Sequence, residues 1–244
     1  MTPGWDGAKG GSALEQLYAG YETWKGWDAL FSYTPEDAAY FDGQLKGIPV
    51  KGAALLEIGF GAGTLLAWAR DQGATVAGTE ISRASLEAAR AAGVDILPAA
   101  FETVAAQYAG RFDVIAALDV FEHFSLEEIL TRLAAAETML KPGGRLVLRF
   151  PNAQSPFGLA PQLGDPTHRT ALSRSAFEQL VRGTSLVIES YQASYLPGGN
   201  SLRRRLVRTA QRLARAAITH ALNAIYAQVI PWDPVVVLVL RKPS

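Results

Sequence analysis

The sequence predicts an α/β fold in which a mostly parallel β-sheet is covered by helices on both faces. Short apolar runs typical of buried strands alternate with segments of helical periodicity over residues 54–118, as in successive βαβ units. The chain has 244 residues, of which 49% are hydrophobic. This is enough to bury one sizeable core, so we expect a single domain with additions.

The first of these units is a strand, a tight glycine loop and a helix within residues 55–66. Glycines at Gly59, Gly61 and Gly63 allow positive φ and let main-chain groups approach a ligand that a Cβ would exclude. The dinucleotide fingerprint requires its third glycine three residues after the second, whereas here it comes after two. The loop therefore predicts a small polar ligand and does not fit a dinucleotide.

Two acidic residues narrow the choice of ligand. Glu57 lies on the strand before the loop, where a carboxylate repels phosphate and attracts an amino group. Glu80 ends the next apolar run, about 20 residues further on, where an acid accepts hydrogen bonds from ribose hydroxyls. Together with the glycines, these acids indicate S-adenosyl-L-methionine; the alternative is a glycine-rich turn in some other α/β protein.

The remaining elements follow the same alternation. Ser125 and Glu128 form a capping box that begins a helix running to about Met139. Ligands of parallel sheets bind at the carboxyl ends of the strands, where Asp119 also falls. We expect helices at residues 64–71, 82–92 and 173–182, and strands at residues 74–79, 94–97, 112–118, 145–150, 185–192 and 235–240.

These motifs resemble the class I S-adenosylmethionine-dependent methyltransferases over residues 50–190, including the turn Leu140–Gly144 before strand five. Asp119–His123 matches the Asp-x-x-Glu-His motif of a subgroup that contains O-methyltransferases of quinone, natural-product and glycan tailoring. The resemblance implies a Rossmann-like sheet of seven strands with an antiparallel last strand. It also implies an N-terminal helical cap, residues 1–48, and a methyltransferase domain, residues 49–244.

The resemblance further implies a set of cofactor-binding residues. After strand three the family commonly carries an acid that meets the adenine amino group, but this chain has Ala100. We therefore expect backbone around Ala100 and Phe101 to recognise adenine, with the Phe101 ring or Glu102 assisting; a core role for Phe101 is the alternative. The predicted cofactor-binding residues are Glu57, Gly59, Phe60, Gly61, Gly63, Glu80, Ile81, Ala100, Phe101, Glu102 and Asp119.

Histidine is the expected catalytic base. Methyl transfer from a sulfonium is a direct displacement, so the protein chiefly aligns the reactants, and a hydroxyl acceptor also needs a base that titrates near ambient pH. Among the three histidines, His123 is the first candidate and His168 the second, with Asp165 orienting an imidazole or binding a substrate hydroxyl. The alternatives are a cofactor-wall residue for His123 and a loop brace for His168. His220 is assigned a structural role.

No ligand spacing demands a metal, so none is predicted. The alternative is an ion held where several acidic and histidine side chains converge. Its candidate ligands would be Asp119, Glu122, His123, Asp165 and His168.

Two further segments are expected beside the cleft. Residues 14–41 have a helical, aromatic pattern, and Tyr18, Trp24 and Trp27 are candidates to cover the sulfonium, with a core role as the alternative. Residues 151–172 are rich in proline and glycine and carry the polar run Gly164–Arg169, which predicts a substrate-side loop.

Residues 201–227 contain no acidic residue and predict a basic amphipathic helix, inside an insertion at residues 199–230. We interpret it as a contact for an anionic membrane with a lipid-linked substrate, or for a substrate phosphate; a solvated lid packed on the domain is the alternative. Arginines share one face and apolar residues the other: Arg204, Arg208, Arg212 and Arg215 against Leu202, Leu206, Ala210, Leu213 and Ala217.

Composition limits the function classes. The formal net charge is zero, so no global field favours nucleic acid, and without cysteine there is neither a disulfide framework nor a thiolate metal site. With no secretory pattern and no apolar run of about 18 residues, we expect a cytoplasmic, optionally membrane-peripheral, protein. The predicted function is O-methylation of a small molecule, such as a sugar, glycan or lipid-linked glycan. The alternatives are an amine or nucleic-acid acceptor and a non-catalytic S-adenosylmethionine-binding protein.

Overall fold

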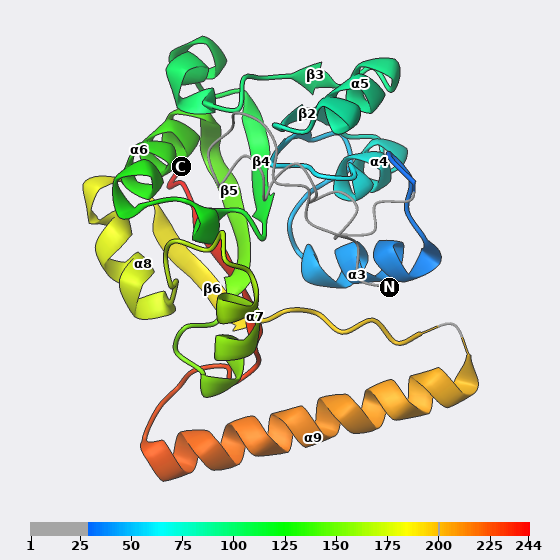
Figure 1. The fold of residues 1–244 in the computed structure, drawn as a ribbon, viewed down its shortest axis with the longest axis vertical. Helices are drawn as coiled ribbons and strands as arrows, with labels where there is room; N and C mark the ends of the chain where they lie inside the picture. Colours follow the sequence, from blue (N-terminus) through cyan, green and yellow to red (C-terminus); the bar gives the residue numbers. More distant parts are fainter. Residues whose placement is uncertain (1–28, 200) are drawn as a thin grey trace, which may run out of the picture.

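Seven strands form one sheet in the order β3-β2-β1-β4-β5-β7-β6 (Figure 1). The structure is a computed structural model that describes residues 29–199 and 201–244. Among the described strands only β7 is antiparallel to its neighbours, so the predicted Rossmann-like fold with an antiparallel last strand is confirmed. The strands are β1 Ala54–Ile58, β2 Thr75–Thr79, β3 Asp95–Ile96, β4 Phe112–Leu118, β5 Leu140–Pro151, β6 Val187–Ala193 and β7 Val235–Arg241.

Helices cover both faces of the sheet, and each face has its own apolar cluster (Figure 1). One face carries α3 Pro35–Gln44, α4 Thr64–Asp71 and α5 Arg83–Ala91. The other carries the 3-10 helix η1 Phe101–Tyr108, α6 Leu126–Met139 and α8 Arg174–Leu180. The remaining elements are η2 Phe121–His123, η3 Pro156–Gly158, α7 Leu159–Gly164, η4 Val181–Gly183 and α9 Leu202–Tyr226.

The parallel register brings the carboxyl ends of β1, β2 and β4 to one edge of the sheet. Ile58, the last residue of β1, lies opposite Thr79 of β2 and Ala117 of β4. From β1 the chain moves to β2 and β3 on one side, and it returns to β4 on the other side. The strand order therefore reverses between β1 and β4, which is where ligands of open α/β sheets bind.

The N-terminal aromatic prediction is only partly testable. Tyr18, Trp24 and Trp27 lie outside the described residues. Residues 29–34 are not helical, so the predicted helix is wrong there. The helix begins only at Pro35, because Thr34 forms a capping box with Asp37 and Pro35 occupies the first turn of α3.

Two later segments also differ in detail from their predictions. Residues 151–172 are less irregular than expected, because they contain η3 and α7. The basic helix is present as α9, 25 residues long, and it lies beside the sheet domain on extended connections (Figure 1).

The capping box that starts α6 matches the sequence prediction. The Ser125 side chain accepts from the backbone N–H of Glu128 at 3.3 Å, and the Glu128 carboxylate accepts from the backbone N–H of Ser125 at 2.8 Å. Ile129 and Leu133 of this helix are fully buried against the sheet. The cap therefore fixes where α6 begins, directly after η2.

Replacing Ser125 with alanine should lower the free energy of unfolding by about 1 kcal/mol, because an N-cap hydroxyl satisfies an otherwise orphaned helix N–H. Urea unfolding followed by circular dichroism measures the change. Thr131→Ala on the exposed face of the same helix is the matched control and should stay within about 0.5 kcal/mol. Equal losses of unfolding free energy in the two variants would show that the Ser125 cap does not stabilise α6 more than an ordinary surface residue does.

Candidate functional site

A cleft of about 890 Å³ opens at the carboxyl ends of β1, β2 and β4. Its walls are formed by residues of α3, the glycine loop and the segments that follow β2, β3 and β4. Many residues predicted from the sequence line it, namely Glu57, Gly59, Phe60, Gly61, Glu80, Ile81, Ala100, Asp119 and His123. Gly63, Phe101, Glu102, Asp165 and His168 are not among the lining residues.

The glycine loop approaches its surroundings too closely for side chains. Gly59 and Gly61 have φ values of 64° and 53°, in the left-handed region that favours glycine. A Cβ on Gly59 would lie 2.8 Å from Cγ2 of Val120, and the Gly59 N–H donates to Thr79 Oγ1 at 3.2 Å. The loop therefore presents main chain, not side chains, to this part of the cleft.

Glu80 connects the glycine loop to the end of β2. Its Oε2 accepts from the Gly61 N–H at 2.7 Å, while Oε1 accepts from the N–H groups of Ile81 at 2.6 Å and Ser82 at 3.0 Å. A carboxylate has about four lone-pair sites, so Oε2 keeps capacity for one more donor. The acid is thus oriented by backbone and can accept a further hydrogen bond from a ligand.

Glu57 is a buried carboxylate at the end of β1. Its side chain is 4% exposed, and Oε2 has no hydrogen-bond partner within the described part of the chain. Burial raises the pKa of Glu57 well above its ordinary value, the nearby Glu80 raises it further, and Arg149 opposes both effects. A cationic ligand group beside this buried acid would stabilise its ionised form.

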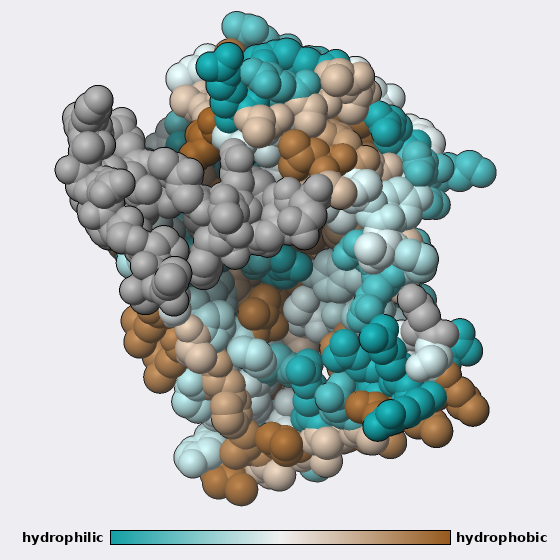
Figure 2. All heavy atoms as spheres, turned by 45° about the vertical axis from the view of Figure 1, so that its right-hand side comes forward, coloured by the Kyte–Doolittle hydropathy of each residue, from teal (hydrophilic) through white to brown (hydrophobic). Residues whose placement is uncertain are grey.

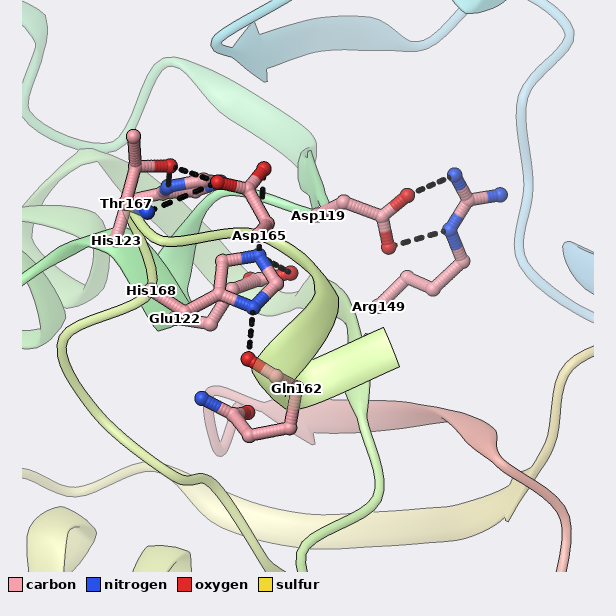
Figure 3. A network of polar contacts seen from close by, with 8 residues as sticks. All are labelled: Asp119, Glu122, His123, Arg149, Gln162, Asp165, Thr167 and His168. Carbon is pink, nitrogen blue, oxygen red and sulfur yellow. Dashed lines mark hydrogen bonds and ion pairs between the residues drawn. The ribbon is translucent and has the colours of Figure 1, made fainter. Parts of the chain in front are cut away.

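Asp119 leaves β4 in a left-handed conformation, with φ of 58°, and binds Arg149 of β5 (Figure 3). The Arg149 Nε donates to Asp119 Oδ1 at 2.9 Å, and Nη2 donates to Oδ2. Arg149 Nη1 also donates to Tyr40 Oη at 3.1 Å, and Tyr40 contacts Ser194 Oγ at 3.1 Å. Burial disfavours the charge on Arg149, but Asp119 and Tyr40 outweigh it and raise the pKa of Arg149.

His123 lines the cleft and is held from behind by Thr167 and Asp165 (Figure 3). Thr167 Oγ1 lies 2.9 Å from His123 Nδ1 and donates to Asp165 Oδ1 at 2.5 Å. Because the only hydroxyl proton of Thr167 goes to Asp165, the oxygen accepts from Nδ1–H of His123. This assigns the imidazole lone pair of the neutral ring to Nε2.

His168 packs edge-on against His123, with ring centroids 4.7 Å apart. Its Nδ1 lies 2.9 Å from the carbonyl oxygen of Gln162, and its Nε2 lies 3.9 Å from oxygens of both Glu122 and Asp165. Candidate metal-ligand atoms of Glu122, His123 and His168 fall within 4.8 Å of one another. Asp119, which the sequence analysis grouped with them, is engaged by Arg149 instead.

Three predicted cofactor residues lie away from the cleft surface. Phe101 is fully buried in the core, and Glu102 faces Arg132 at 3.4 Å. Gly63 is the N-cap of α4, where a Cβ would lie 2.8 Å from the Phe31 ring. Ala100 lines the cleft and stays the predicted adenine contact, and Phe101 occupies the core position that was its alternative.

Comparison with known proteins identifies the chain. A family profile described as "Methyltransferase domain" matches residues 39–191, more than half of the sequence. This chain belongs to that methyltransferase family.

Two curated relatives carry the name ubiquinone biosynthesis O-methyltransferase. The protein from Thiobacillus denitrificans is 32% identical over 102 residues, which cover 39% of this methyltransferase and 43% of the relative. The protein from Bordetella avium is 26% identical over 158 residues, which cover 62% and 65% of the two chains. This methyltransferase thus matches less than two thirds of the length of either relative.

A solved structure from Archaeoglobus fulgidus, described as an S-adenosylmethionine-dependent methyltransferase, shares the fold of this methyltransferase. The TM-score is 0.59 at 16% identity, with 84% of this chain and 92% of that chain covered. The predicted methyltransferase class and fold are confirmed. The predicted cofactor agrees with the solved structures that share the fold, one described as S-adenosylmethionine-dependent and another as carrying S-adenosylhomocysteine. Whether it belongs to the Asp-x-x-Glu-His subgroup stays a prediction.

The cleft of the methyltransferase fits this cofactor in three ways. The unpartnered Glu57 Oε2 matches an amino group, and the remaining acceptor site on Glu80 matches a ribose hydroxyl. The loop at Gly59 and Gly61 turns with positive φ and lines the cleft with main chain, against which a nucleoside would pack. No acidic side chain occupies the position after β3, so Ala100 offers only main-chain hydrogen bonds there.

Sequence reasoning missed Arg149, Tyr40 and Thr167. Arg149 stands in an apolar strand, and its partner Asp119 is 30 residues away, so only strand pairing brings them together. Tyr40 was one of several aromatic residues with no distinguishing mark. Thr167 sits between Asp165 and His168 in the predicted substrate loop, and a hydroxyl two residues after an aspartate is the one local signal that could have identified it.

Replacing Glu57 with glutamine should weaken binding of S-adenosylmethionine at least about tenfold, because a charged hydrogen bond to the amino group is lost. Isothermal titration calorimetry measures the affinity. Glu178→Gln, at an exposed ion pair on α8, is the matched control and should bind like the wild type. Unchanged affinity in Glu57→Gln would exclude Glu57 from the cofactor site.

Glu57→Gln should weaken cofactor binding but, in the absence of ligand, raise the free energy of unfolding relative to wild type at high pH. A raised folded-state pKa means that Glu57 contributes stability below its unfolded pKa and that this contribution is lost as the pH rises through the folded pKa. Without ligand, the free energy of unfolding of Glu57→Gln minus that of wild type should therefore be larger above the folded pKa of Glu57 than at acidic pH. Urea unfolding across this pH range tests the sign.

Proposed function

We propose that the protein is an O-methyltransferase that transfers the methyl group of S-adenosylmethionine to a hydroxyl of a small molecule. The observation that carries the proposal is the contact chain from His123 at the cleft through Thr167 to Asp165. The names of the two curated relatives support oxygen as the acceptor atom. A sugar, glycan or lipid-linked glycan stays the acceptor class predicted from the sequence.

The donor side of the cleft would hold the cofactor. Glu57 would bind its amino group, Glu80 its ribose, and the glycine loop would pack against the nucleoside through main chain. When bound, the cofactor supplies an electrophilic methyl group on a sulfonium. The protein then has to place an acceptor oxygen in line with that group and exclude water.

His123 would remove the proton from the acceptor hydroxyl. Its Nδ1–H is directed at Thr167, so Nε2 is the nitrogen that can accept a proton. Burial opposes the charge on Asp165, but bonds from Thr167 and the nearby histidines prevail and lower the pKa of Asp165. An ionised Asp165 behind Thr167 would stabilise His123 once it is protonated, as a buried carboxylate does in a catalytic triad.

His168 takes a supporting position in this scheme. It does not line the cleft, and its Nδ1 donates to the Gln162 carbonyl, so its ring is fixed against His123. The sequence ranked it second as a base, and its placement agrees with a brace for His123. Assays run with and without a chelator test the alternative, an ion held by Glu122, His123 and His168.

The proposal is tested by incubating the protein with methyl-labelled S-adenosylmethionine and a small-molecule cell extract, followed by mass spectrometry of the products. An O-methylated small molecule is the expected result. Label on an amine or on RNA would support the corresponding alternative acceptor. Cofactor binding without transfer to any fraction would favour a non-catalytic binding protein.

Replacing His123 with glutamine should lower kcat about 100- to 10,000-fold, the usual contribution of a positioned base. Cofactor affinity should remain near wild type, because in the proposed mechanism His123 contacts the acceptor hydroxyl, whereas Glu57 and Glu80 bind the donor. His220→Gln on the exposed side of α9 is the matched control and should keep full activity. Normal turnover in His123→Gln would remove His123 from the mechanism.

Replacing Thr167 with valine should test whether the relay to Asp165 positions the base. Valine preserves shape but cannot bridge the two groups, so kcat should fall while KM changes little. The rising limb of the pH–rate profile should also move to lower pH, because Asp165 no longer favours protonated His123.

Thr167→Ser retains the hydroxyl and should restore both the rate and the profile. A purely structural role for Thr167 would leave the pH profile of the valine variant unmoved. That result would contradict the relay.

A further inference from the structure

The basic helix α9 has the opposite orientation to an ordinary surface helix. Surface helices of globular proteins turn their apolar stripe toward the core. In α9 no residue is buried, and six large aliphatic residues are between 49% and 76% exposed. They are Leu202 at 76%, Leu206 at 65%, Val207 at 49%, Leu213 at 67%, Ile218 at 51% and Ile225 at 71%.

The basic face of α9 is the one that holds the helix to the domain. Arg208 Nη2 lies 3.5 Å from Glu36 Oε1 of α3, and Arg215 Nη1 lies 3.1 Å from Asp233 Oδ1. Arg212 donates through Nε to the Leu196 carbonyl at 3.1 Å. Three of the four arginines that the sequence assigned to an anionic partner are therefore engaged by the protein itself.

The two faces are separated around the helix axis. At 3.6 residues per turn the six apolar side chains fall within an arc of roughly 160°, and the three engaged arginines fall within roughly 60° on the opposite side. Figure 2 shows hydrophobic atoms along the lower edge of the molecule, where Figure 1 places α9, with hydrophilic atoms above them. The outward side of α9 thus carries an exposed apolar strip, with Arg203 at its N-terminal end, and exposed apolar surface of this kind usually marks a binding surface.

The charge at the start of α9 indicates what covers this strip. Arg203, Arg204 and Arg205 are exposed, and none forms an ion pair with an acidic residue in the described part of the chain. Cations in the first turn oppose the helix dipole, and no acidic residue in that turn offsets them. A layer of phosphate groups would satisfy both the dipole and the arginines.

From these observations we infer that α9 binds in the plane of a membrane that carries anionic lipids. The apolar strip enters the boundary between headgroups and acyl chains, and Arg203–Arg205 contact lipid phosphates. None of the described helices is long and apolar enough to cross a bilayer, which agrees with binding at the surface. RNA is disfavoured as the partner, because the outward side is apolar and much of the basic face is turned inward.

The test uses the full-length protein and sedimentation with vesicles. One set contains equal parts of phosphatidylglycerol and phosphatidylcholine, and the other contains phosphatidylcholine alone. Wild-type protein should partition to the anionic vesicles at least about tenfold more strongly, and added salt should weaken this binding. Failure to bind the anionic vesicles would overturn the proposal.

Two variants separate the apolar and charged contributions. Leu206→Gln with Leu213→Gln keeps helix propensity and should lower partitioning at least about tenfold. Arg203→Gln with Arg204→Gln and Arg205→Gln should reduce the preference for anionic vesicles. The matched control is Leu126→Gln with Leu130→Gln, two exposed leucines of α6, which should bind vesicles like wild type.

Other occupants of the strip would give different results. Light scattering that shows a dimer dissociated by Leu206→Gln with Leu213→Gln, without vesicle binding by wild type, would assign the strip to a second copy and overturn the proposal. Retention on RNA that survives this double variant, again without vesicle binding, would also overturn it. Circular dichroism and cofactor binding verify that every variant is folded, independently of any methyl acceptor.

Discussion

The site depends on one unfavourable placement, the carboxylate of Glu57 at the end of the central strand β1. The strands on either side, β2 and β4, and the clusters on both faces exclude water from it. Because Oε2 has no hydrogen-bond partner among residues 29–199 and 201–244, the fold carries a group whose ionisation it resists. A cationic ligand removes that resistance, so binding of the donor and stabilisation of the fold are the same event.

Under the proposed function, the other charged groups belong to a donor side and an acceptor side of the cleft. On the donor side, backbone N–H groups fix the carboxylate of Glu80 in place. On the acceptor side, Asp119 and Arg149 form an ion pair in which their charges offset each other, whereas Glu122 and Asp165 place carboxylates beside His168. The cap at Ser125 starts α6 directly after η2, and so fixes the position from which His123 projects.

Local sequence signals were enough to find the proposed donor residues that line the cleft, because these residues are close in the chain. Glu57 and the glycines stand within seven positions, and Glu80 ends the adjacent strand. The acceptor half depends on contacts between distant segments. Thr167 meets His123 from 44 residues away, which spacing along the chain does not reveal. Phe101 shows a related limit, since an aromatic residue after a strand fits a core position and a ligand wall equally well.

Helix α9 shows a different limit of sequence reasoning. Its amphipathic period predicted the helix and its two faces correctly, but period alone does not say which face meets the protein. The usual choice is apolar inward. Here the acceptors available on the domain are Glu36, Asp233 and a main-chain carbonyl, and these select the arginine face. The orientation follows from the partner surface and not from the helix.

The segments that flank α9 tie it to the acceptor side of the cleft. Before the helix, Ser194 contacts Tyr40, which also binds Arg149. After it, the carbonyls of Pro231 and Asp233 accept from the fully buried Asn152, at the start of the predicted substrate loop. The first connection thus ends at Tyr40, which lines the cleft, and the second ends at the start of the predicted substrate loop.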